Sequence, residues 1–299
     1  MKPVNRRHFM KGSLVAAASA PFLQGTAGAT VQTALTTGPH RIIDTHVYLS
    51  RWPGRRLPGD EPKALVASLR QQQVAQGWTG SFDALLHKDV GAVNYRLAEE
   101  CARHGEGLLL PFGTVNPTLP DWEEDLRRCH EEFHMPGIRL HPNYHHYDLE
   151  DPEFSRLLRL AQERKLLVQI VAWMEDERVQ IQGLQTPLVN LHPLAALLEG
   201  LPEARVMVLN GFISLGSVRL PWQRFRKLKN FAFDLAMLEQ LMGLRVLIDA
   251  VGVDHVAFGS YSPMFYFESA LLKLRESDLS PAESAVVLNG NAQRLLSRS

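Results

Sequence analysis

The stretch RIIDTHVYL, residues 41–49, is an apolar run in which polar side chains recur at every second position. Alternation with a period of two is typical of a β-strand, and it places Asp44, His46 and Tyr48 on the same face. A His-x-His pair on such a strand can hold a metal ion, but here Tyr48 stands in the second place. The stretch therefore predicts a first strand that carries polar groups toward a site at its carboxyl end.

Seven more apolar runs follow and alternate with segments of helical periodicity. They are mostly continuous, which is typical of strands that are buried on both faces. The eight predicted strands are residues 41–49, 81–87, 108–115, 137–143, 166–173, 205–212, 230–236 and 255–261. Eight strand–helix alternations over about 250 residues predict an α/β fold, a single (β/α)8 barrel. An open doubly wound sheet is the alternative, but the chain has no G-x-G-x-x-G or phosphate-binding loop to favour it.

Three long loops follow predicted strand ends, and a barrel places its active-site loops there. Residues 51–61 are rich in Pro, Gly and Arg, and residues 174–186 and 213–224 form two further loops. We therefore expect functional side chains in these segments.

The N-terminus has the features of an export signal. Residues 5–11 resemble a twin-arginine motif, a weakly apolar run follows, and residues 27–29 (AGA) offer a cleavage site. We predict a signal peptide over residues 1–29, a linker over 30–40 and the barrel domain over 41–299, with a disordered basic tail as the alternative for the first segment. The apolar run is too short for a good spanning helix, so no stable membrane anchor is expected after cleavage. The twin-arginine route implies a periplasmic protein.

Composition limits the class of partner. The 299 residues are 45% hydrophobic, and 32 Lys and Arg balance 32 Asp and Glu. Zero net charge argues against a nucleic-acid partner, so we expect a small-molecule substrate or ligand, and a homo-oligomer stays open. Cys101 and Cys129 lie on apolar helix stripes and are predicted to be buried thiols, although a disulfide between neighbouring helices is an alternative.

Several motifs, taken in order and spacing, resemble those of one family. Residues 43–46 read IDTH, 137–142 read GIRLHP, 151–154 read DPEF, 258–263 read FGSYSP and 289–292 read NGNA. Together they are similar to the amidohydrolase superfamily, most closely to its amidohydrolase-related branch, over residues 41 to 297. The resemblance implies a metal-dependent-hydrolase barrel with one or two divalent metals, zinc being expected, at the carboxyl ends of strands 1, 5, 6 and 8.

The chain departs from that pattern at the metal ligands. When the family's five metal-ligand positions are carried over to this sequence, they fall on His46, Tyr48, about Val171, Asn210 and Tyr261. Four of the five are non-ligands or poor ligands, because zinc takes four donors from Cys, His and carboxylates. In the family the strand-8 aspartate also serves as general base on metal-bound water, and a tyrosine with a pKa near 10 is a poor substitute. We therefore predict no metal-ligating residues and no bound cofactor.

The remaining polar residues favour acid–base chemistry without a metal. We predict that His46 and His141 transfer protons and that Arg139 holds a carboxylate or a developing oxyanion. Glu175 and Asp176, after strand 5, are further catalytic candidates. A structural ion pair of Arg139 with an inward carboxylate, and a solvated loop at Glu175 and Asp176, are the alternatives.

Two other groups of histidines are candidates for a metal site. A divalent-metal site formed by His46, His141 and Asp234 is a minority alternative. His145 and His146 have no carboxylate at helical spacing, so we predict that they form a surface pair.

Aromatic residues gather where the strands are predicted to end. Tyr48, Trp173, Asn210, Tyr261 and Tyr266 are predicted to contact a substrate, and the aromatic members favour a flat or apolar ligand. Packing of loops over the barrel mouth is the alternative interpretation.

Three hypotheses of function follow. The first is an amidohydrolase-like hydrolase, or a decarboxylating lyase, that acts on a small carboxylate, lactone or aromatic substrate without the usual metal centre. The second is a catalytically inactive barrel that binds a small ligand. The third is a metalloenzyme with rearranged ligands.

Overall fold

The fold is seen in a computed structural model that describes residues 42–211 and 220–297. The predicted signal peptide 1–29, linker 30–40, Arg41 and most of the loop 213–224 lie outside the described residues. The described residues belong to one compact unit.

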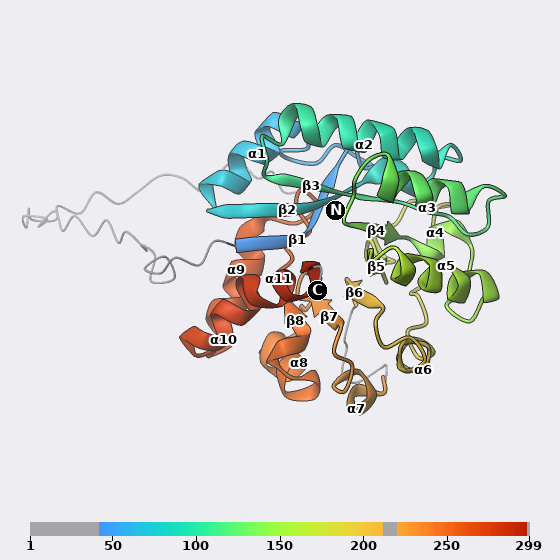
Figure 1. The fold of residues 1–299 in the computed structure, drawn as a ribbon. Coiled ribbons are helices and arrows are strands. Elements are labelled where there is room, and N and C mark those ends of the chain that lie inside the picture. The colour runs from blue at the N-terminus through green and yellow to red at the C-terminus, as the bar shows by residue number, and fades with distance from the viewer. Residues whose placement is uncertain (1–41, 212–219, 298–299) are drawn as a thin grey trace, which may run out of the picture. The chain divides into compact units, whose positions relative to one another are not determined.

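Eight parallel strands surround a common axis in the order β1 to β8 (Figure 1). Their bounds are β1 Ile42–Leu49, β2 Val74–Ser81, β3 Leu109–Gly113, β4 Gly137–Leu140, β5 Leu167–Val171, β6 Arg205–Leu209, β7 Phe231–Asp234 and β8 Val256–Ala257. The ring closes between β8 and β1, where Thr45 N donates to Phe258 O and Tyr48 N donates to Ser262 O, both at 2.9 Å. The predicted single (β/α)8 barrel is confirmed.

Helices lie outside the strands (Figure 1). The α-helices are α1 Pro62–Gln71, α2 Val90–His104, α3 Trp122–Glu131, α4 Pro142–His145, α5 Pro152–Glu163, α6 Leu194–Glu199, α7 Trp222–Phe225, α8 Gly243–Val251, α9 Phe267–Glu276, α10 Pro281–Ala285 and α11 Asn291–Leu296. Short 3-10 turns span Phe82–Leu85 and Val253–His255, and a π-helical turn, Val286–Gly290, joins α10 to α11. Among the described helices, none has the length and apolar character needed to cross a bilayer.

Helix starts follow the local signals in the sequence. Ser280 and Glu283 form a capping box at the start of α10, in which each side chain bonds the backbone of the other residue. Asp151 occupies the N-cap position of α5, and the apolar stripe that starts at Phe154 is buried. Cys101 and Cys129 are buried free thiols, so the disulfide alternative is not realised.

The second strand was predicted in the wrong place. Residues 81–87 were expected to be a strand, but β2 ends at Ser81 and Phe82–Leu85 form a 3-10 turn. The hydroxyl of Ser81 accepts from the backbone N–H of Asp83, which turns the chain at that point. The real strand contains two glycines and a glutamine, so its apolar pattern is weak.

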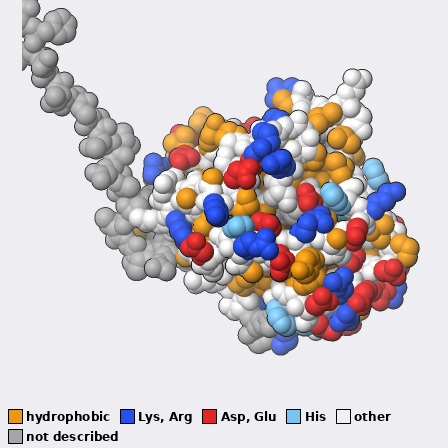
Figure 2. Space-filling view, turned by 90° about the horizontal axis from the view of Figure 1, so that it is seen from above, with side chains coloured by type: hydrophobic (Ala, Val, Ile, Leu, Met, Phe, Trp, Pro, Cys, Tyr) orange, Lys and Arg blue, Asp and Glu red, His pale blue; other side chains and the backbone are white. Residues whose placement is uncertain are grey.

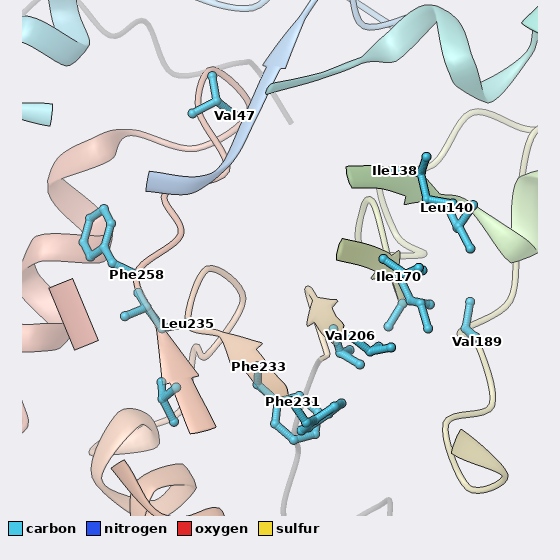
Figure 3. Packing of buried hydrophobic residues seen from close by; sticks show 14 of the residues in the cluster. Val47, Ile138, Leu140, Ile170, Val189, Val206, Phe231, Phe233, Leu235 and Phe258 are labelled. Atoms are coloured by element: carbon cyan, nitrogen blue, oxygen red, sulfur yellow. The ribbon is translucent and has the colours of Figure 1, made fainter. Parts of the chain in front are cut away.

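Side chains on the strands divide between two apolar clusters. Outward residues such as Ile138, Ile170, Val206 and Phe233 pack in the layer between strands and helices, as Figure 3 shows. Inward residues such as Trp78 fill the barrel itself. Because successive side chains of a strand point to opposite faces, one continuous apolar run contributes side chains to both clusters.

The surface mixes both signs of charge. On the face drawn in Figure 2, basic and acidic side chains lie among each other and among hydrophobic ones. This face therefore offers no uniform basic area for a polyanion.

Candidate functional site

A histidine–aspartate pair lies where β1 meets β7. Nδ1 of His46 is 2.7 Å from Oδ2 of Asp234, and both side chains are at most 1% exposed. The other oxygen of Asp234 accepts from the backbone N–H of Asn210 at 2.8 Å. Gly259 of the chain after β8 makes the approach feasible, since a Cβ there would lie 3.0 Å from both the Asp234 carboxylate and the His46 Cβ.

Burial keeps His46 neutral. Loss of hydration lowers the pKa of His46 to about 4, although the hydrogen bond and charge of Asp234 act in the opposite direction. The hydrogen bond between Nδ1 and Asp234 fixes the orientation of the neutral ring. Nε2 has no hydrogen-bond partner in the described part of the chain.

Tyr261 covers His46. The two rings stack at 4.4 Å between centroids and 18° between planes, and the Tyr261 hydroxyl donates to the carbonyl of Met174 at 2.7 Å. Tyr261 is fully buried, so its pKa is raised well above 10 and it stays protonated. Its backbone φ of 61° lies in the left-handed region, which is uncommon for an aromatic residue and aims the ring inward.

Tyr48 meets His141 through its hydroxyl rather than through a stacked ring. The Tyr48 hydroxyl lies 2.8 Å from Nε2 of His141, and the Tyr48 ring stacks on Phe82 at 4.4 Å. Burial lowers the pKa of His141 well below 6.5 and raises that of Tyr48. We call His46, Tyr48, His141 and Tyr261 the plug, because these four side chains fill the barrel end and are at most 1% exposed.

Arg139 lies beneath the plug and is fully buried. Its guanidinium donates to the carbonyls of Thr45, Val47 and Trp78 at 2.7–3.2 Å and to Oε1 of Gln169 at 2.8 Å. It also lies 4.6 Å from the centre of the Tyr48 ring. Its donors are thus directed at the barrel's own backbone rather than at a ligand or at the carboxylates that the sequence left as ion-pair partners.

Glycine in β2 makes room for that arginine. A Cβ at Gly80 would lie 2.8 Å from Nη1 of Arg139 and 2.9 Å from its Cδ. The absence of a side chain on β2 therefore allows the guanidinium to cross the interior of the barrel.

Asp44 is the remaining inward carboxyl of β1. Ser260 donates to it twice, from its backbone N–H at 2.9 Å and from its hydroxyl at 2.5 Å. Burial raises the pKa of Asp44 to about 6, and the two bonds from Ser260 only partly oppose this. Asp44 thus ties β1 to the chain after β8 rather than facing a cavity.

The donor set of the plug does not fit a divalent metal. Two of the places that resemble the family's metal positions are tyrosines whose hydroxyls bond other protein groups, and a third, Val171, lies in the apolar interior cluster. In residues 42–211 and 220–297, no three His, Cys, Asp or Glu side chains come together as a metal would require. The minority alternative of a site from His46, His141 and Asp234 therefore has no geometric basis in these residues.

A pocket lies on the loop side of the plug. It measures about 420 Å³ and is formed by residues that follow β1, β5, β7 and β8. We call it the loop pocket; its lining residues are Arg55, Trp173, Met174, Glu175, Asp176, Arg178, Val179, Met237, Glu239, Gln240, Met264 and Phe265. Met174 connects it to the plug, because its carbonyl and its sulfur both contact the Tyr261 hydroxyl.

The structure divides the predicted site residues between these two places. His46, His141, Tyr48 and Tyr261 form the plug, and Arg139 supports it from below. The loop pocket instead contains Trp173, Glu175 and Asp176.

Two predicted residues belong neither to the plug nor to the lining of the loop pocket. Asn210 is buried, has a φ of 50° and donates to the carbonyl of Trp173 at 2.7 Å. Tyr266 is 73% exposed and does not line the loop pocket.

One histidine prediction was wrong. His146 is exposed, but His145 is buried, and its Nε2 lies 2.8 Å from the carbonyl of Ala84. The short helix α4 turns the two neighbours to opposite sides.

Sequence reasoning missed three charged members of the loop pocket, one of which is Arg178, the partner of Asp176. Arg55 pairs with Glu175, which lies 120 positions away in the chain, and Glu239 lies in the turn after β7. The position of Arg55 in the predicted loop 51–61 was the available signal, but nothing local identified its partner.

Comparison with known proteins agrees with this architecture. A sequence profile of the amidohydrolase family matches residues 43–298. A search of curated protein sequences finds no match.

Solved structures with the same fold include several decarboxylases. The chain is similar to 5-carboxyvanillate decarboxylase from Sphingomonas paucimobilis, with 15% identity and a TM-score of 0.62 over 86% of this chain and 99% of that one. The enzyme of the same name from Novosphingobium aromaticivorans, complexed with manganese and 4-hydroxy-3-methoxy-5-nitrobenzoic acid, has 12% identity and a TM-score of 0.66 over 86% and 96%. The 2,6-dihydroxybenzoate decarboxylase from Rhizobium has 14% identity and a TM-score of 0.63, and the match covers 85% of this chain and 98% of that one. At these identities the likeness shows the fold alone.

Proposed function

Because the chain belongs to the amidohydrolase family, we propose that it keeps the family's barrel without the family's metal chemistry, and that it binds a small ring-bearing ligand in the loop pocket. The plug then serves as the floor beneath the ligand. Binding takes place at the carboxyl ends of the strands, as in other barrels of this class.

The observation that carries the proposal is the bonding of the plug. His46 is held by Asp234, Tyr48 contacts His141, and Tyr261 bonds a backbone carbonyl. Buried polar groups that already have protein partners gain little from a metal and lose those partners if they bind one. The groups are also closed to solvent, so a substrate would have to open the plug to reach them.

The walls of the loop pocket favour a ligand with an apolar, flat body. Trp173 and Phe265 contribute aromatic side chains to the lining, and Met237 and Met264 contribute adaptable thioethers. The surrounding loops add exposed apolar side chains, of which Leu241 is 89% exposed and Val179 58%. The structural neighbours are named as decarboxylases of 5-carboxyvanillate and 2,6-dihydroxybenzoate, and these single-ring compounds agree with a small, flat ligand.

Metal analysis and ligand titration test the proposal together. We expect purified protein to contain no stoichiometric zinc or manganese and its melting temperature to be unchanged by EDTA. We also expect saturable binding of a simple ring compound such as 2-phenylethanol, weakened by Phe265→Ala. Tyr95→Ala, which removes an exposed ring on α2, is the matched control and should leave binding unchanged. A bound metal whose removal lowers the melting temperature overturns the proposal.

A metal-free hydrolase or lyase is the second candidate, and one observation favours it. The Glu175 carboxylate lines the loop pocket while its side chain is only 6% exposed, and Arg55 pairs with it. A carboxylate in this position could accept the proton of an attacking water, while the guanidinium could stabilise the negative charge that develops on a carbonyl oxygen.

Turnover of small aryl esters, lactones and aryl carboxylates tests this second candidate. Glu175→Gln keeps the size of the side chain but removes the base, so activity should fall at least about a hundredfold. Glu177→Gln, an exposed neighbour that does not line the pocket, is the control. If compounds of all three substrate classes bind but none is turned over, the second candidate is excluded and only the ligand-binding function stands.

We also propose that residues 1–29 direct export to the periplasm by the twin-arginine route. The Arg6-Arg7 pair ahead of an apolar run supports this. Cell fractionation of the full chain should recover it in the periplasm, and replacement of both arginines by lysine should retain it in the cytoplasm.

A further inference from the structure

The charges of the loop pocket are unequal. Its wall contains three carboxylates, from Glu175, Asp176 and Glu239, and two guanidinium groups, from Arg55 and Arg178. Full ionisation gives the lining a net charge of −1. The sign matters because a partly enclosed pocket concentrates the field of its lining charges on the ligand.

Both guanidinium groups are already engaged by acids. Arg55 pairs with Glu175 through Nη1. Arg178 holds Asp176 with two bonds, Nε to Oδ1 at 2.9 Å and Nη2 to Oδ2 at 2.6 Å. A carboxylate ligand would have to share an arginine with the acid that already balances its charge.

Glu239 is the carboxylate left over. It is exposed on the turn after β7 and forms no ion pair with the residues that the structure describes. Arg178 and Lys273 interact with it electrostatically, but Arg178 is bonded to Asp176, and the Lys273 ammonium donates to the carbonyl of Ala236. Glu239 is therefore available to a cation that enters the pocket.

The apolar walls also favour positive charge. The faces of the Trp173 and Phe265 rings carry negative electrostatic potential, so they attract an ammonium group placed over them. The same rings accept the flat body of a ligand through stacking. Charge and shape thus select the same kind of molecule.

We infer that the loop pocket recognises an aromatic or aryl-alkyl amine, with its ammonium group paired with Glu239 and its ring against Trp173 and Phe265. This inference rests on the proposed ligand-binding function and adds the charge of the ligand to it. It sets the chain apart from the neighbours in the fold comparison, whose names describe aromatic carboxylates.

Three probes of matched shape test the inference by calorimetric titration. They are 2-phenylethylammonium, neutral 2-phenylethanol and anionic 3-phenylpropionate. We expect the ammonium compound to bind at least about fivefold more tightly than the alcohol, and the carboxylate to bind most weakly. Glu239→Gln should abolish the preference for the ammonium compound while it leaves the affinity for the alcohol unchanged.

Two further variants sharpen the result. Asp176→Asn releases the guanidinium of Arg178 and should shift the preference toward the carboxylate probe. Glu163→Gln removes an exposed acid on α5, outside the pocket, and should change none of the three affinities.

The outcomes separate the two proposals. Equal affinities for the ammonium compound and the alcohol, or tighter binding of the carboxylate, overturn the inference while ligand binding itself stands. Failure of all three probes to bind overturns ligand binding and the inference together.

Discussion

The plug and the loop pocket lie at the same end of one barrel, yet their side chains are used in opposite ways. In the plug, imidazole and phenol groups are at most 1% exposed and bond to other protein groups. In the loop pocket, carboxylate and guanidinium groups stand beside an open volume of about 420 Å³. At the strand ends of this barrel the polar side chains are therefore part of the core, and the open volume lies further out, among the loops.

Physical chemistry explains the contrast. A metal centre needs several buried ligands that share one positive ion, and without the ion their mutual repulsion and desolvation would be costly. A tyrosine hydroxyl needs only one acceptor, and its ring adds apolar contact area, so Tyr48 and Tyr261 can fill the same volume at low cost. Substitutions in the plug should therefore change stability, whereas substitutions in the loop pocket should change binding.

The largest effect is expected at Arg139. Arg139→Met keeps most of the volume but removes the guanidinium donor from the carbonyls of Thr45, Val47 and Trp78. Of these, the Thr45 carbonyl keeps a bond from Nε2 of Gln169. The free energy of unfolding, measured by urea titration, should fall by about 4 kcal/mol or more. Arg178→Met, in the exposed wall of the loop pocket, should leave the urea midpoint unchanged. A loss below about 1 kcal/mol for Arg139→Met would contradict the role assigned to this residue.

The pH dependence of stability comes next. Burial lowers the pKa values of His46, His141 and His145, so these rings are neutral in the folded state and take up protons on unfolding. Their contribution is fully present above pH 6.5 and is lost as the pH falls through the lower folded values. The unfolding free energy should therefore decrease between pH 6 and pH 5.

Removing one of these histidines should flatten that dependence. His141→Gln should reduce the slope of unfolding free energy against pH by up to about 1.4 kcal/mol per pH unit. The raised pKa of Asp44 acts in the opposite direction, but it is common to both proteins and cancels in the difference. His192→Gln, an exposed position, is the control. Identical slopes for His141→Gln and the parent would show that this ring is not held neutral.

A smaller effect is expected at the boundary between plug and pocket. Tyr261→Phe removes the hydroxyl that donates to the Met174 carbonyl and keeps the ring on His46. The unfolding free energy should fall by about 1 kcal/mol in urea titrations, because a buried carbonyl loses its donor. Ligand affinity should hardly change. A larger change in affinity than in stability would place Tyr261 in the binding site rather than in the plug.

The smallest effect on stability is expected for Phe265→Ala, whose main effect should be on binding. Phe265 is only partly buried and lines the loop pocket, although it also contacts the edge of Tyr261 at 5.3 Å. Affinity for a ring-bearing probe should fall about fivefold, consistent with the loss of one aromatic contact of about 1 kcal/mol. Calorimetric titration measures the first quantity and thermal unfolding the second. Loss of stability with unchanged affinity would erase the distinction between the two regions.

Much of the fold could be read from local patterns. Continuous apolar runs identify most of the strands, and the Ser-Pro-Ala-Glu pattern of residues 280–283 forms the capping box that begins α10. The placement of β2 failed because its residues, VAQGWTGS, are not a continuous apolar run, whereas the more apolar segment that follows turns at Ser81. The periodicity of apolar residues identifies a strand from its buried side chains. It does not identify β2, where glycine replaces such a side chain and makes room for Arg139.

Residue type and order along the chain are enough to identify the family, the eight-stranded barrel and the replacement of the expected metal ligands at Tyr48, Val171, Asn210 and Tyr261. The pairing of His46 with Asp234, 188 positions away, and of Arg55 with Glu175 in a pocket became visible only in the folded chain. A hydrogen bond or ion pair depends on distance and burial in space. Both are set by barrel closure and loop packing rather than by the neighbours of a residue in the sequence.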